Sequence, residues 1–324
     1  IATGARPATL PGVELNGKQV ISSKEAMILK QLPSTLTIIG GGAIGLEFAY
    51  FYATFGTKVT IVEYMDRILP TGDTDISAAL TRSFKKQGIV IHTSSRVSSV
   101  ETTSNGTKTT FEKNGKETVV DGDVTLVAVG VRGNTENIGC EEIGVDLERG
   151  FVKVDEHCRT SVSSVYAIGD VRGQPALAHV ASGEAIHAVE HLSDKNPPTI
   201  DYKTIPACVY CHPQVASVGM TEREAIEAGH EVKVGRFPFS ANGKSVAVGE
   251  TEGFVKIIGD SRFGEILGAH VIGGEATELI GELAMAKAGE LTVDDLHRTI
   301  HAHPTLSESI MEAAADWSGA AIQM

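Results

Sequence analysis

The segment that most constrains the fold is a glycine-rich turn at residues 40–45, GGGAIG, between an apolar run and a helix-forming run. Residues 36–39 are apolar and β-branched, and residues 46–55 favour a helix that closes at Gly56. A second strand is predicted at 59–62, and it ends on Glu63. Strand, glycine turn, helix and strand ending on an acid together form the pattern of a Rossmann dinucleotide-binding unit.

Each residue of this pattern has a physical task. Gly40 makes the turn, Gly42 lets the backbone approach a pyrophosphate, and Gly45 lets the helix pack closely on the strand. The helix N-terminus then faces the phosphates. Glu63 can accept hydrogen bonds from both adenosine ribose hydroxyls but would repel a 2′-phosphate, which favours NAD over NADP, although the nearby Arg67 leaves NADP open. The alternative is that the glycines only make a tight bend.

The length, charge and cysteine content limit the class of protein. A chain of 324 residues is long enough for two or three domains. Its formal net charge of −13 argues against nucleic acid or an anionic membrane as a partner, because phosphate contacts need clustered Lys and Arg. No apolar run approaches the ~20 residues of a membrane span, and the first residues are not a signal peptide. Four cysteines are too few for a disulfide scaffold and favour a reducing compartment.

The remaining pattern predicts an α/β protein followed by an α+β part. Ser22 and Glu25 form the capping box of a short helix. Helices are predicted at 74–87 and 177–192, antiparallel hairpins at 95–123, and buried strands at 124–129 and 165–168. Pro197 and Pro198 mark a boundary. Beyond it, strands at 254–258 and 267–272 alternate with helices at 277–288 and 306–315.

The stretch CVYCH at 208–212 allows several interpretations. C-x-x-C-H can attach haem, C-x-x-C can form a redox disulfide, and the pair could bind a metal adventitiously. Haem attachment would require export, for which no signal is visible. In an extended strand Cys208 and Cys211 point to opposite faces, so we expect an inert pair. Cys140 and Cys158 are expected to be structural.

The stretch HAHPTLSE at 301–308 also has competing interpretations. Thr305 and Glu308 have the spacing of a helix capping box, with Pro304 holding His303 extended. His301 and His303 could bind a metal, but no acid or thiol ligand pair lies nearby. Glu308 could instead accept the Nδ1 proton of His303 and make Nε2 a general acid/base. Capping and catalysis can coexist at this site.

Together these segments resemble the disulfide-reducing flavoprotein family that uses pyridine nucleotides. The matching segments are ATG at 2–4, GGGAIGLE at 40–47, VTIVE at 59–63, VYAIGD at 165–170 with LAH at 177–179, PQVASVGMT at 213–221, and HAHPTLSE at 301–308. They follow the family's order over nearly the whole chain. The resemblance implies a Rossmann-like NAD domain, part of an FAD domain and an α+β dimerisation domain. It divides the chain into a connector at 1–33, the NAD domain at 34–130, the rest of the FAD domain at 131–200 and the dimer interface at 201–324.

The resemblance also implies the site residues. Glu47 would lie beside the nicotinamide and flavin, where the family pairs it with a lysine. Asp170 would bind the flavin ribityl chain, with 176–179 along the flavin and 3–5 closing over it. His303, oriented by Glu308, would serve a dithiol and reach the partner subunit's disulfide. The implied set for the dinucleotide is Gly40, Gly42, Ala43, Ile44, Gly45, Glu47, Glu63, Val97 and Gly130; for the flavin it is Thr3, Gly4, Ala5, Asp170, Ala176, Leu177, Ala178 and His179.

The resemblance implies an NAD-linked enzyme that oxidises a protein-bound dithiol through a disulfide and FAD. Its partners would be a second copy of the chain and the lipoyl domain of a 2-oxoacid dehydrogenase or related complex, in bacterial cytoplasm or an organelle matrix. The first half of the FAD domain and the active dithiol are expected before residue 1, so the chain reads as truncated. The alternatives are a relative of glutathione or mercuric reductase, against which Glu63 and HAHPTLSE argue, and a non-catalytic fragment that binds NAD and dimerises.

Overall fold

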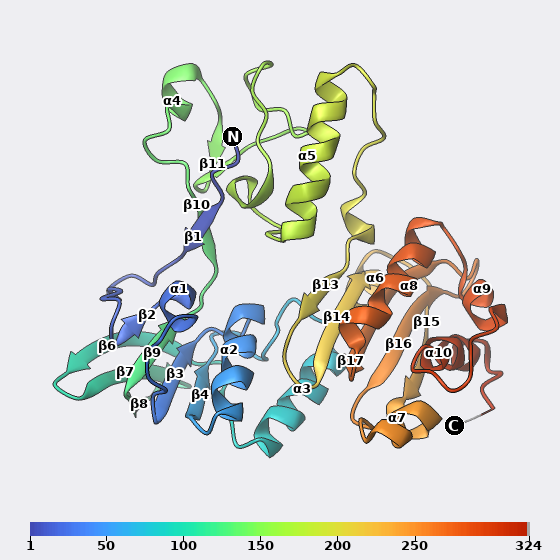
Figure 1. The fold of residues 1–324 in the computed structure, drawn as a ribbon, viewed down its shortest axis with the longest axis horizontal. Helices are drawn as coiled ribbons and strands as arrows, with labels where there is room; N and C mark the ends of the chain where they lie inside the picture. Colours follow the sequence, from blue (N-terminus) through green and yellow to red (C-terminus); the bar gives the residue numbers. More distant parts are fainter. Residues whose placement is uncertain (323–324) are drawn as a thin grey trace. The chain divides into compact units, whose positions relative to one another are not determined.

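The computed structural model describes residues 1–322, which form two units. The first unit consists of Ile1–Leu10 and Val129–Tyr202, and the second consists of Pro11–Ala128 and the chain from Lys203 onward. We call Pro11–Ala128 the N-terminal module of the second unit and the part from Lys203 its C-terminal module. Figure 1 shows the elements of each. In the described part of the chain, no helix has the length and apolar character needed to cross a membrane.

A parallel sheet of five strands, in the order β2-β9-β3-β4-β5, forms the centre of the N-terminal module. Its strands are β2 (Val20–Ile21), β3 (Thr35–Ile39), β4 (Lys58–Val62), β5 (Val90–His92) and β9 (Val124–Val127). Helices α1 (Ser23–Ala26), α2 (Ala43–Thr54) and α3 (Thr74–Lys86) connect them. The predicted order of strand, turn, helix and strand is confirmed, and so is the capping box of Ser22 and Glu25.

The predicted hairpins form a separate antiparallel sheet of β6 (Arg96–Thr103), β7 (Gly106–Lys113) and β8 (Lys116–Gly122). Asn114 and Gly115 both have positive φ in the second turn, at 52° and 76°, as a tight hairpin requires. This sheet packs on the parallel sheet, where the Thr125 hydroxyl of β9 lies 2.7 Å from that of Thr107 and 3.2 Å from that of Thr109. The prediction of hairpins at 95–123 is therefore confirmed.

The C-terminal module contains an antiparallel sheet in the order β13-β14-β17-β16-β15. Its strands are β13 (Ala207–Val209), β14 (Gln214–Gly219), β15 (Val232–Pro238), β16 (Phe254–Asp260) and β17 (Ile266–Gly273). Its helices are α6 (Glu222–Glu227), α7 (Gly243–Val248), α8 (Ala276–Ala288), α9 (Val293–Arg298) and α10 (Glu308–Ser318), with short 3₁₀ turns at Tyr202–Thr204 and Phe239–Ala241. Helices α8 and α10 pack on the sheet.

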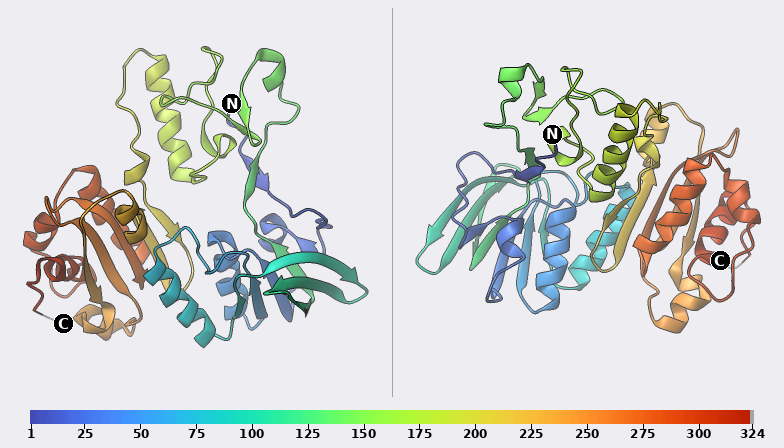
Figure 2. Two further views of the ribbon diagram at one scale, coloured as in Figure 1. Left: turned by 180° about the vertical axis from the view of Figure 1, so that it is seen from behind. Right: turned by 45° about the horizontal axis from the view of Figure 1, so that its top comes forward.

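The two modules of the second unit share a hydrophobic core, and a separate core lies under α8 and α10. Successive residues of β16 face different neighbours: Phe254 joins the core of the N-terminal module, whereas Val255 joins the core under α8 and α10. The same alternation holds for Ile272 and Val271 on β17. Helices α2 and α3 lie between the two five-stranded sheets, as Figure 2 shows. Every residue of β16 and β17 is consequently buried.

The first unit is built from short elements. Strand β1 (Ala5–Pro7) pairs antiparallel with β10 (Val131–Gly133), and β11 (Leu147–Glu148) pairs with β12 (Phe151–Val152). Helix α4 (Cys140–Ile143), the 3₁₀ helix η1 (Gly169–Arg172) and helix α5 (Ala178–Leu192) complete it. The predicted connector, 1–33, thus supplies a strand to each unit, β1 to the first and β2 to the parallel sheet.

The prediction of a buried strand at 165–168 is wrong, because the structure has no regular strand there. Tyr166 forms only an isolated bridge with Arg159. The neighbouring backbone bonds run to different segments, since the amide of Ala167 donates to Cys158 and the amide of Ile168 donates to Ile1. A strand needs a continuous ladder with one neighbour, and this run finds none among the described residues.

Candidate functional site

The glycine turn between β3 and α2 has the geometry that its sequence suggests. Gly40 has a φ of 108°, a backbone angle that residues with a side chain rarely adopt. A Cβ added to Gly45 would lie 2.0 Å from the backbone oxygen of Gly40, so the helix can approach the strand only without a side chain there. A Cβ on Gly42 would meet nothing within 4 Å, so that backbone faces open space.

The first turn of α2 is open to a ligand. Gly42 is the N-cap residue and provides no side-chain cap, while Ala43 and Ile44 are exposed. The first amide groups of a helix have no partner within the helix and carry its positive dipole end. These residues therefore fit a pyrophosphate.

Glu63 lies directly beside this turn. The residue is 6% exposed, and its carboxylate accepts hydrogen bonds from the Gly41 amide at 2.5 Å and the Met65 amide at 2.6 Å. The amide of Leu69 in turn donates to the Gly41 carbonyl at 2.7 Å, which ties the loop after β4 to the turn. Each carboxylate oxygen keeps a second acceptor position that a ribose hydroxyl can use.

Glu47 lies farther along α2 and contacts the CVYCH stretch. Its Oε1 accepts a hydrogen bond of 2.9 Å from the Tyr210 amide. Burial raises the pKa of Glu47, and the bond from Tyr210 offsets this only in part. No described residue forms an ion pair with Glu47, so the lysine that the family resemblance implies does not come from this part of the chain.

Two other predicted dinucleotide residues lie in different units. Val97 is half-buried on β6, where the pairing with β7 shifts register. Gly130 belongs to the first unit, has a φ of 109°, and its carbonyl accepts the Ala8 amide at 2.9 Å. The structure thus groups the glycine turn with Glu63, and Val97 lies two residues after Ser95, whose amide donates to the Glu63 carbonyl at 2.9 Å.

The predicted flavin residues all lie in the first unit. Gly169 packs against α5, its amide donates to Oε2 of the buried Glu184 at 2.7 Å, and Arg172 forms an ion pair with the same carboxylate. Glu184 thereby fixes η1 on the helix. The Asp170 carboxylate is half-buried, and no described residue forms a hydrogen bond or ion pair with it.

The start of α5 and the segment 3–5 complete this region. Leu177 is the N-cap of α5 and gives no side-chain cap; Ala178 and His179 are exposed, and Ala176 is half-buried. The Thr3 hydroxyl donates to the Asn134 carbonyl at 2.7 Å, which holds Gly4 and Ala5 against the end of β10. A free carboxylate and an uncapped helix N-terminus fit the ribityl and phosphate groups of a flavin.

His303 and Glu308 form a close pair at the start of α10. Nδ1 of His303 lies 2.9 Å from Oε1 of Glu308, and the His303 side chain is 76% exposed while that of Glu308 is 12% exposed. Burial alone would raise the pKa of Glu308, but hydrogen bonds from the Thr305 amide and from His303 outweigh it and hold that pKa below its usual value. The carboxylate is therefore ionised and orients the exposed ring, whose Nε2 has no hydrogen-bond partner among the described residues.

The capping box predicted at Thr305 and Glu308 is only half present. Oε2 of Glu308 accepts the Thr305 amide at 2.8 Å, but the Thr305 hydroxyl donates to Ala302, not to the helix. The helix begins at Glu308 rather than at residue 306. One carboxylate thus serves both the helix start and His303.

His301 is placed differently from a metal ligand. Its Nε2 lies 2.7 Å from Oε1 of Glu282, and its Nδ1 lies 2.9 Å from the Thr299 carbonyl. Both ring nitrogens are thus engaged with protein acceptors. No group of three or more His, Cys, Asp and Glu side chains in the described residues could hold a metal ion.

The two cysteines of CVYCH pack into different cores. Cys208 on β13 packs against the core under α8, whereas Cys211 belongs to the core shared with the N-terminal module. Both thiols are free. Burial raises the pKa of Cys208 and raises that of Cys211 to about 12, so neither is a ready nucleophile.

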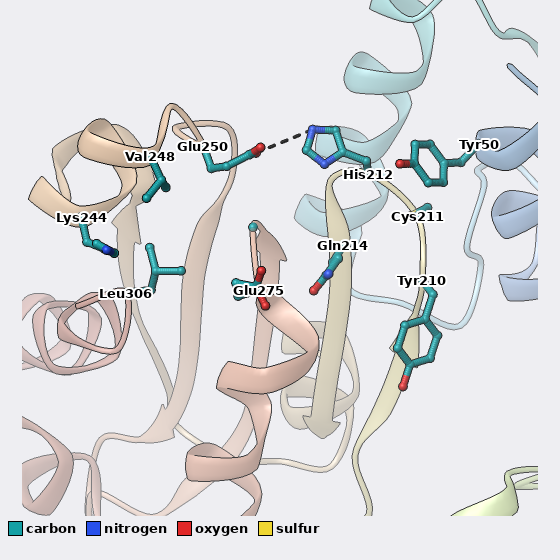
Figure 3. Close-up of a pocket in the computed structure, with 11 residues that line it drawn as sticks. Tyr50, Tyr210, Cys211, His212, Gln214, Lys244, Val248, Glu250, Glu275 and Leu306 are labelled. Atoms are coloured by element: carbon teal, nitrogen blue, oxygen red, sulfur yellow. Dashed lines mark ion pairs between the residues drawn. The ribbon is translucent and has the colours of Figure 1, made fainter. Parts of the chain in front are cut away.

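CVYCH borders a cavity of about 520 Å³. Figure 3 shows Tyr210, Cys211 and His212 on one side and Leu306, from the loop that precedes Glu308, on the other. His212 faces Glu250, with Nε2 and Oε2 3.7 Å apart. The cavity therefore joins the CVYCH turn to the loop that carries His303.

Sequence reasoning missed a buried ion cluster between the modules. Nζ of Lys256, on β16, lies 2.9 Å from Asp73, 2.8 Å from Asp75 and 2.7 Å from Glu222. Lys256 is 1% exposed. The only sign of this cluster in the sequence is a lysine in the otherwise apolar run FVKII, because the acidic partners of that lysine lie on other segments.

Comparison with known proteins places this geometry in a family. Residues 1–185 match the family described as pyridine nucleotide-disulphide oxidoreductase, and residues 205–314 match its dimerisation domain. The chain belongs to the pyridine nucleotide-disulphide oxidoreductase family. It is accordingly an oxidoreductase whose family uses FAD and NAD, and the dimerisation domain supports a homodimer.

Named relatives narrow the group to the dihydrolipoyl dehydrogenases. The chain is 48% identical over 317 residues to dihydrolipoyl dehydrogenase of Chlorobaculum tepidum, covering 98% of this chain and 68% of that protein. The corresponding enzyme of Bacillus subtilis is 46% identical over 324 residues, covering 99% and 68%. Among solved structures, LpdA of Mycobacterium tuberculosis superposes with a TM-score of 0.89 at 32% identity, covering 97% of this chain and 68% of that one. The chain thus spans about two thirds of the length of these relatives.

Proposed function

We propose that the described residues supply the pyridine-nucleotide site, part of the flavin site and the acid/base pair for NAD-linked oxidation of a protein-bound dihydrolipoyl group. The observation that carries this proposal is the exposed His303 ring held by the ionised Glu308, with 2.9 Å between Nδ1 and Oε1. An inert capping residue would not need an exposed imidazole beside it.

We assign the cofactors to the places where the backbone is open to a ligand. Gly40, Gly42, Ala43, Ile44 and Gly45 would bind the pyrophosphate of NAD, and Glu63 its adenosine ribose. Thr3 to Ala5, Asp170 and 176–179 would hold FAD, and Glu47 would lie near the reacting rings. When bound, FAD would receive the electrons of the dithiol and NAD would receive them as a hydride.

His303 would handle the proton of the reaction. The neutral ring accepts a thiol proton at Nε2, which leaves the more nucleophilic thiolate to attack a disulfide. Glu308 fixes the tautomer with the proton on Nδ1 and stabilises the charged ring that results.

The proposal also includes the domains and partners. We assign 1–33 to a connector, 34–130 to the NAD domain, 131–200 to the FAD domain and 201–324 to the dimer interface. The second copy of the chain would bind through the last of these, and the dithiol would arrive on a lipoyl domain of a 2-oxoacid dehydrogenase or related complex. Bacterial relatives such as those of Chlorobaculum tepidum favour bacterial cytoplasm over an organelle matrix.

A spectroscopic experiment tests this function. The protein is purified together with the segment that is expected before residue 1, scanned for flavin absorbance with and without added FAD, and then mixed with dihydrolipoamide and NAD. A flavin band that bleaches with dihydrolipoamide, followed by NADH formation, is the expected result. Saturable NADH binding without any flavin or dithiol oxidation would overturn the dehydrogenase proposal and favour a non-catalytic NAD-binding chain.

Substitution of the dyad provides a sharper test. We expect His303→Gln to lower kcat for dihydrolipoamide by about 10²–10⁴-fold, because it removes the acid/base group. The Kd for NADH should not change, because the glycine turn is untouched. His230→Gln, which removes a histidine that contacts Asp260 instead, is the matched control. Equal activity of the two variants would rule out the assigned role of His303.

A further inference from the structure

A second cavity, of about 500 Å³, lies at the carboxyl ends of β4 and β5. The loop after β4 contributes Tyr64, Met65 and Arg67, and the segment after β5 contributes Ser94 and Arg96. The two segments are joined, since the Ser94 amide donates to the Met65 carbonyl at 2.7 Å. Ligands of open α/β sheets bind at this end of the strands.

The cavity adjoins Glu63. The amide of Met65, which lines the cavity, donates to Oε1 of Glu63 at 2.6 Å. If Glu63 accepts the adenosine ribose, as the proposed function states, the adenine beyond that ribose must extend toward Tyr64 and Met65. Both side chains are exposed, at 69% and 47%. The inference that follows rests on that proposed function.

One wall of the cavity comes from the C-terminal module. Arg223, on α6, lines it although its neighbours on the opposite wall lie more than a hundred residues earlier in the chain. The Lys256 cluster holds the two walls together. Nζ of Lys256 lies 2.7 Å from Glu222, the residue before Arg223, and 2.9 Å from Asp73, which ends the loop after β4 and caps α3. The Glu222 amide also donates to Asp73 at 3.2 Å.

The charge of the cavity is opposite to that of the chain. Three arginines, Arg67, Arg96 and Arg223, line it together with a single acid, Asp66, although the chain has a net charge of −13. Nε of Arg67 is buried and has no hydrogen-bond partner in the described part of the chain. Arg223 contacts Glu227 at 3.6 Å, but both side chains are more than 60% exposed, at 63% and 66%, so the pair is weak.

We propose that Arg223, from the C-terminal module, binds the adenosine end of the nicotinamide dinucleotide, and that Glu222 and Lys256 are the positioning residues that hold it over the cavity. A guanidinium can stack on the adenine face and attract the diphosphate charge at once. The C-terminal module is then part of the cofactor site as well as the site of dimerisation.

The experiment compares ligands that contain or lack the adenosine. Kd values are measured by fluorescence titration for NADH and for reduced nicotinamide mononucleotide, and AMP is measured by competition with NADH. We expect Arg223→Ala to raise the Kd for NADH and AMP about threefold to tenfold, the range of a stacked cation. The mononucleotide should bind as before, and Arg223→Lys, which keeps the charge but not the planar group, should fall between. Arg82→Ala, an exposed arginine on α3 that does not line the cavity, is the control.

Two outcomes would overturn the assignment of Arg223. Unchanged Kd values for NADH and AMP in Arg223→Ala would exclude any contact with the adenosine. Equal weakening of the mononucleotide would mean that the substitution distorts the whole site. A wild-type protein that binds no NADH would instead refute the proposed function itself, which keeps the two failures distinguishable.

The positioning role has its own test in a double-mutant cycle. Glu222→Ala removes the contact of Lys256 with α6 but leaves the buried pair of Lys256 and Asp73 intact. We expect it to weaken NADH binding about twofold to threefold alone and to add nothing in the Arg223→Ala background, because residues that act through one another are not additive. Additive effects would show that Glu222 does not act through Arg223.

Discussion

Gly45 is the residue at which the glycine turn tolerates least change. Its absent Cβ would meet the backbone oxygen of Gly40 at 2.0 Å, and a backbone atom cannot move aside as a flexible side chain can. We expect Gly45→Ala to destabilise the protein by about 1–3 kcal/mol and to weaken NADH binding, because α2 must shift away from β3. Urea unfolding and NADH titration measure both effects. Gly281→Ala on α8, where an added Cβ meets nothing within 4 Å, should be neutral or stabilising; the same loss at both positions would contradict this account.

At the scale of elements, the Lys256 cluster joins β16 and α6 to the start of α3. Burial by itself would lower the pKa of Lys256, but hydrogen bonds to Asp75, Glu222 and Asp73 outweigh it and raise that pKa above its usual value. Lys256→Met would leave Asp73 buried without its cation, and we expect a loss of about 3–5 kcal/mol. The free energy of unfolding in urea measures it. Lys30→Met, at an exposed lysine before β3, is the control and should change little.

Sequence predicts local elements and local sites well and distant contacts poorly. The glycine turn, the hairpins at Asn114 and Gly115, and the closeness of His303 to Glu308 all depend on residues near one another in the chain. Lys256 pairs with Asp73, and Arg223 lines a cavity with Arg96, in both cases across more than a hundred residues of the chain, which no local pattern encodes. The strand prediction at 165–168 is wrong for the same reason, because apolar and β-branched residues do not by themselves provide a neighbouring strand to pair with.

At the scale of the whole molecule, each unit contains a buried histidine and should lose stability in weak acid. In the first unit, Nδ1 of His157 lies 3.1 Å from Nε2 of the buried His187, and His157 also stacks on His191 at 4.2 Å between centroids. Burial lowers the pKa of His187, and the two neighbouring histidines lower it further, while Glu190 opposes them. Tyr166 contacts His191 at 2.8 Å, and Glu156 lies 3.8 Å from His157.

The sign of this effect gives a pH window. A histidine with a lowered pKa binds fewer protons in the folded state than in the unfolded state, so stability falls as the pH drops below the ordinary value of 6.5. In the second unit, burial lowers the pKa of the buried His270 on β17 in the same way, so the same window applies there. Bonds to Lys256 and Glu222 keep the pKa of Asp73 below 3.8, and the stability from Asp73 is lost only in stronger acid. Hydrogen exchange should be faster at pH 5.5 than at pH 7.5 in both α5 and β17, once corrected for the intrinsic effect of pH on exchange. His187→Phe should remove this effect in α5 but not in β17, whereas an unchanged effect in α5 of that variant would refute the role of His187.

The hydrophobic core that the two modules of the second unit share limits how such a chain can change over evolutionary time. Phe254 and Ile272 belong to the same apolar cluster as Tyr52 and Phe84. Replacement of either module by an unrelated one would therefore expose the hydrophobic surface of the module that remains. Recombination at the boundary near residue 203 would be selected against even if both Rossmann and dimerisation sequences were intact. The two modules should therefore be inherited together, and a substitution on one side of their shared core should be accompanied by a compensating substitution on the other side.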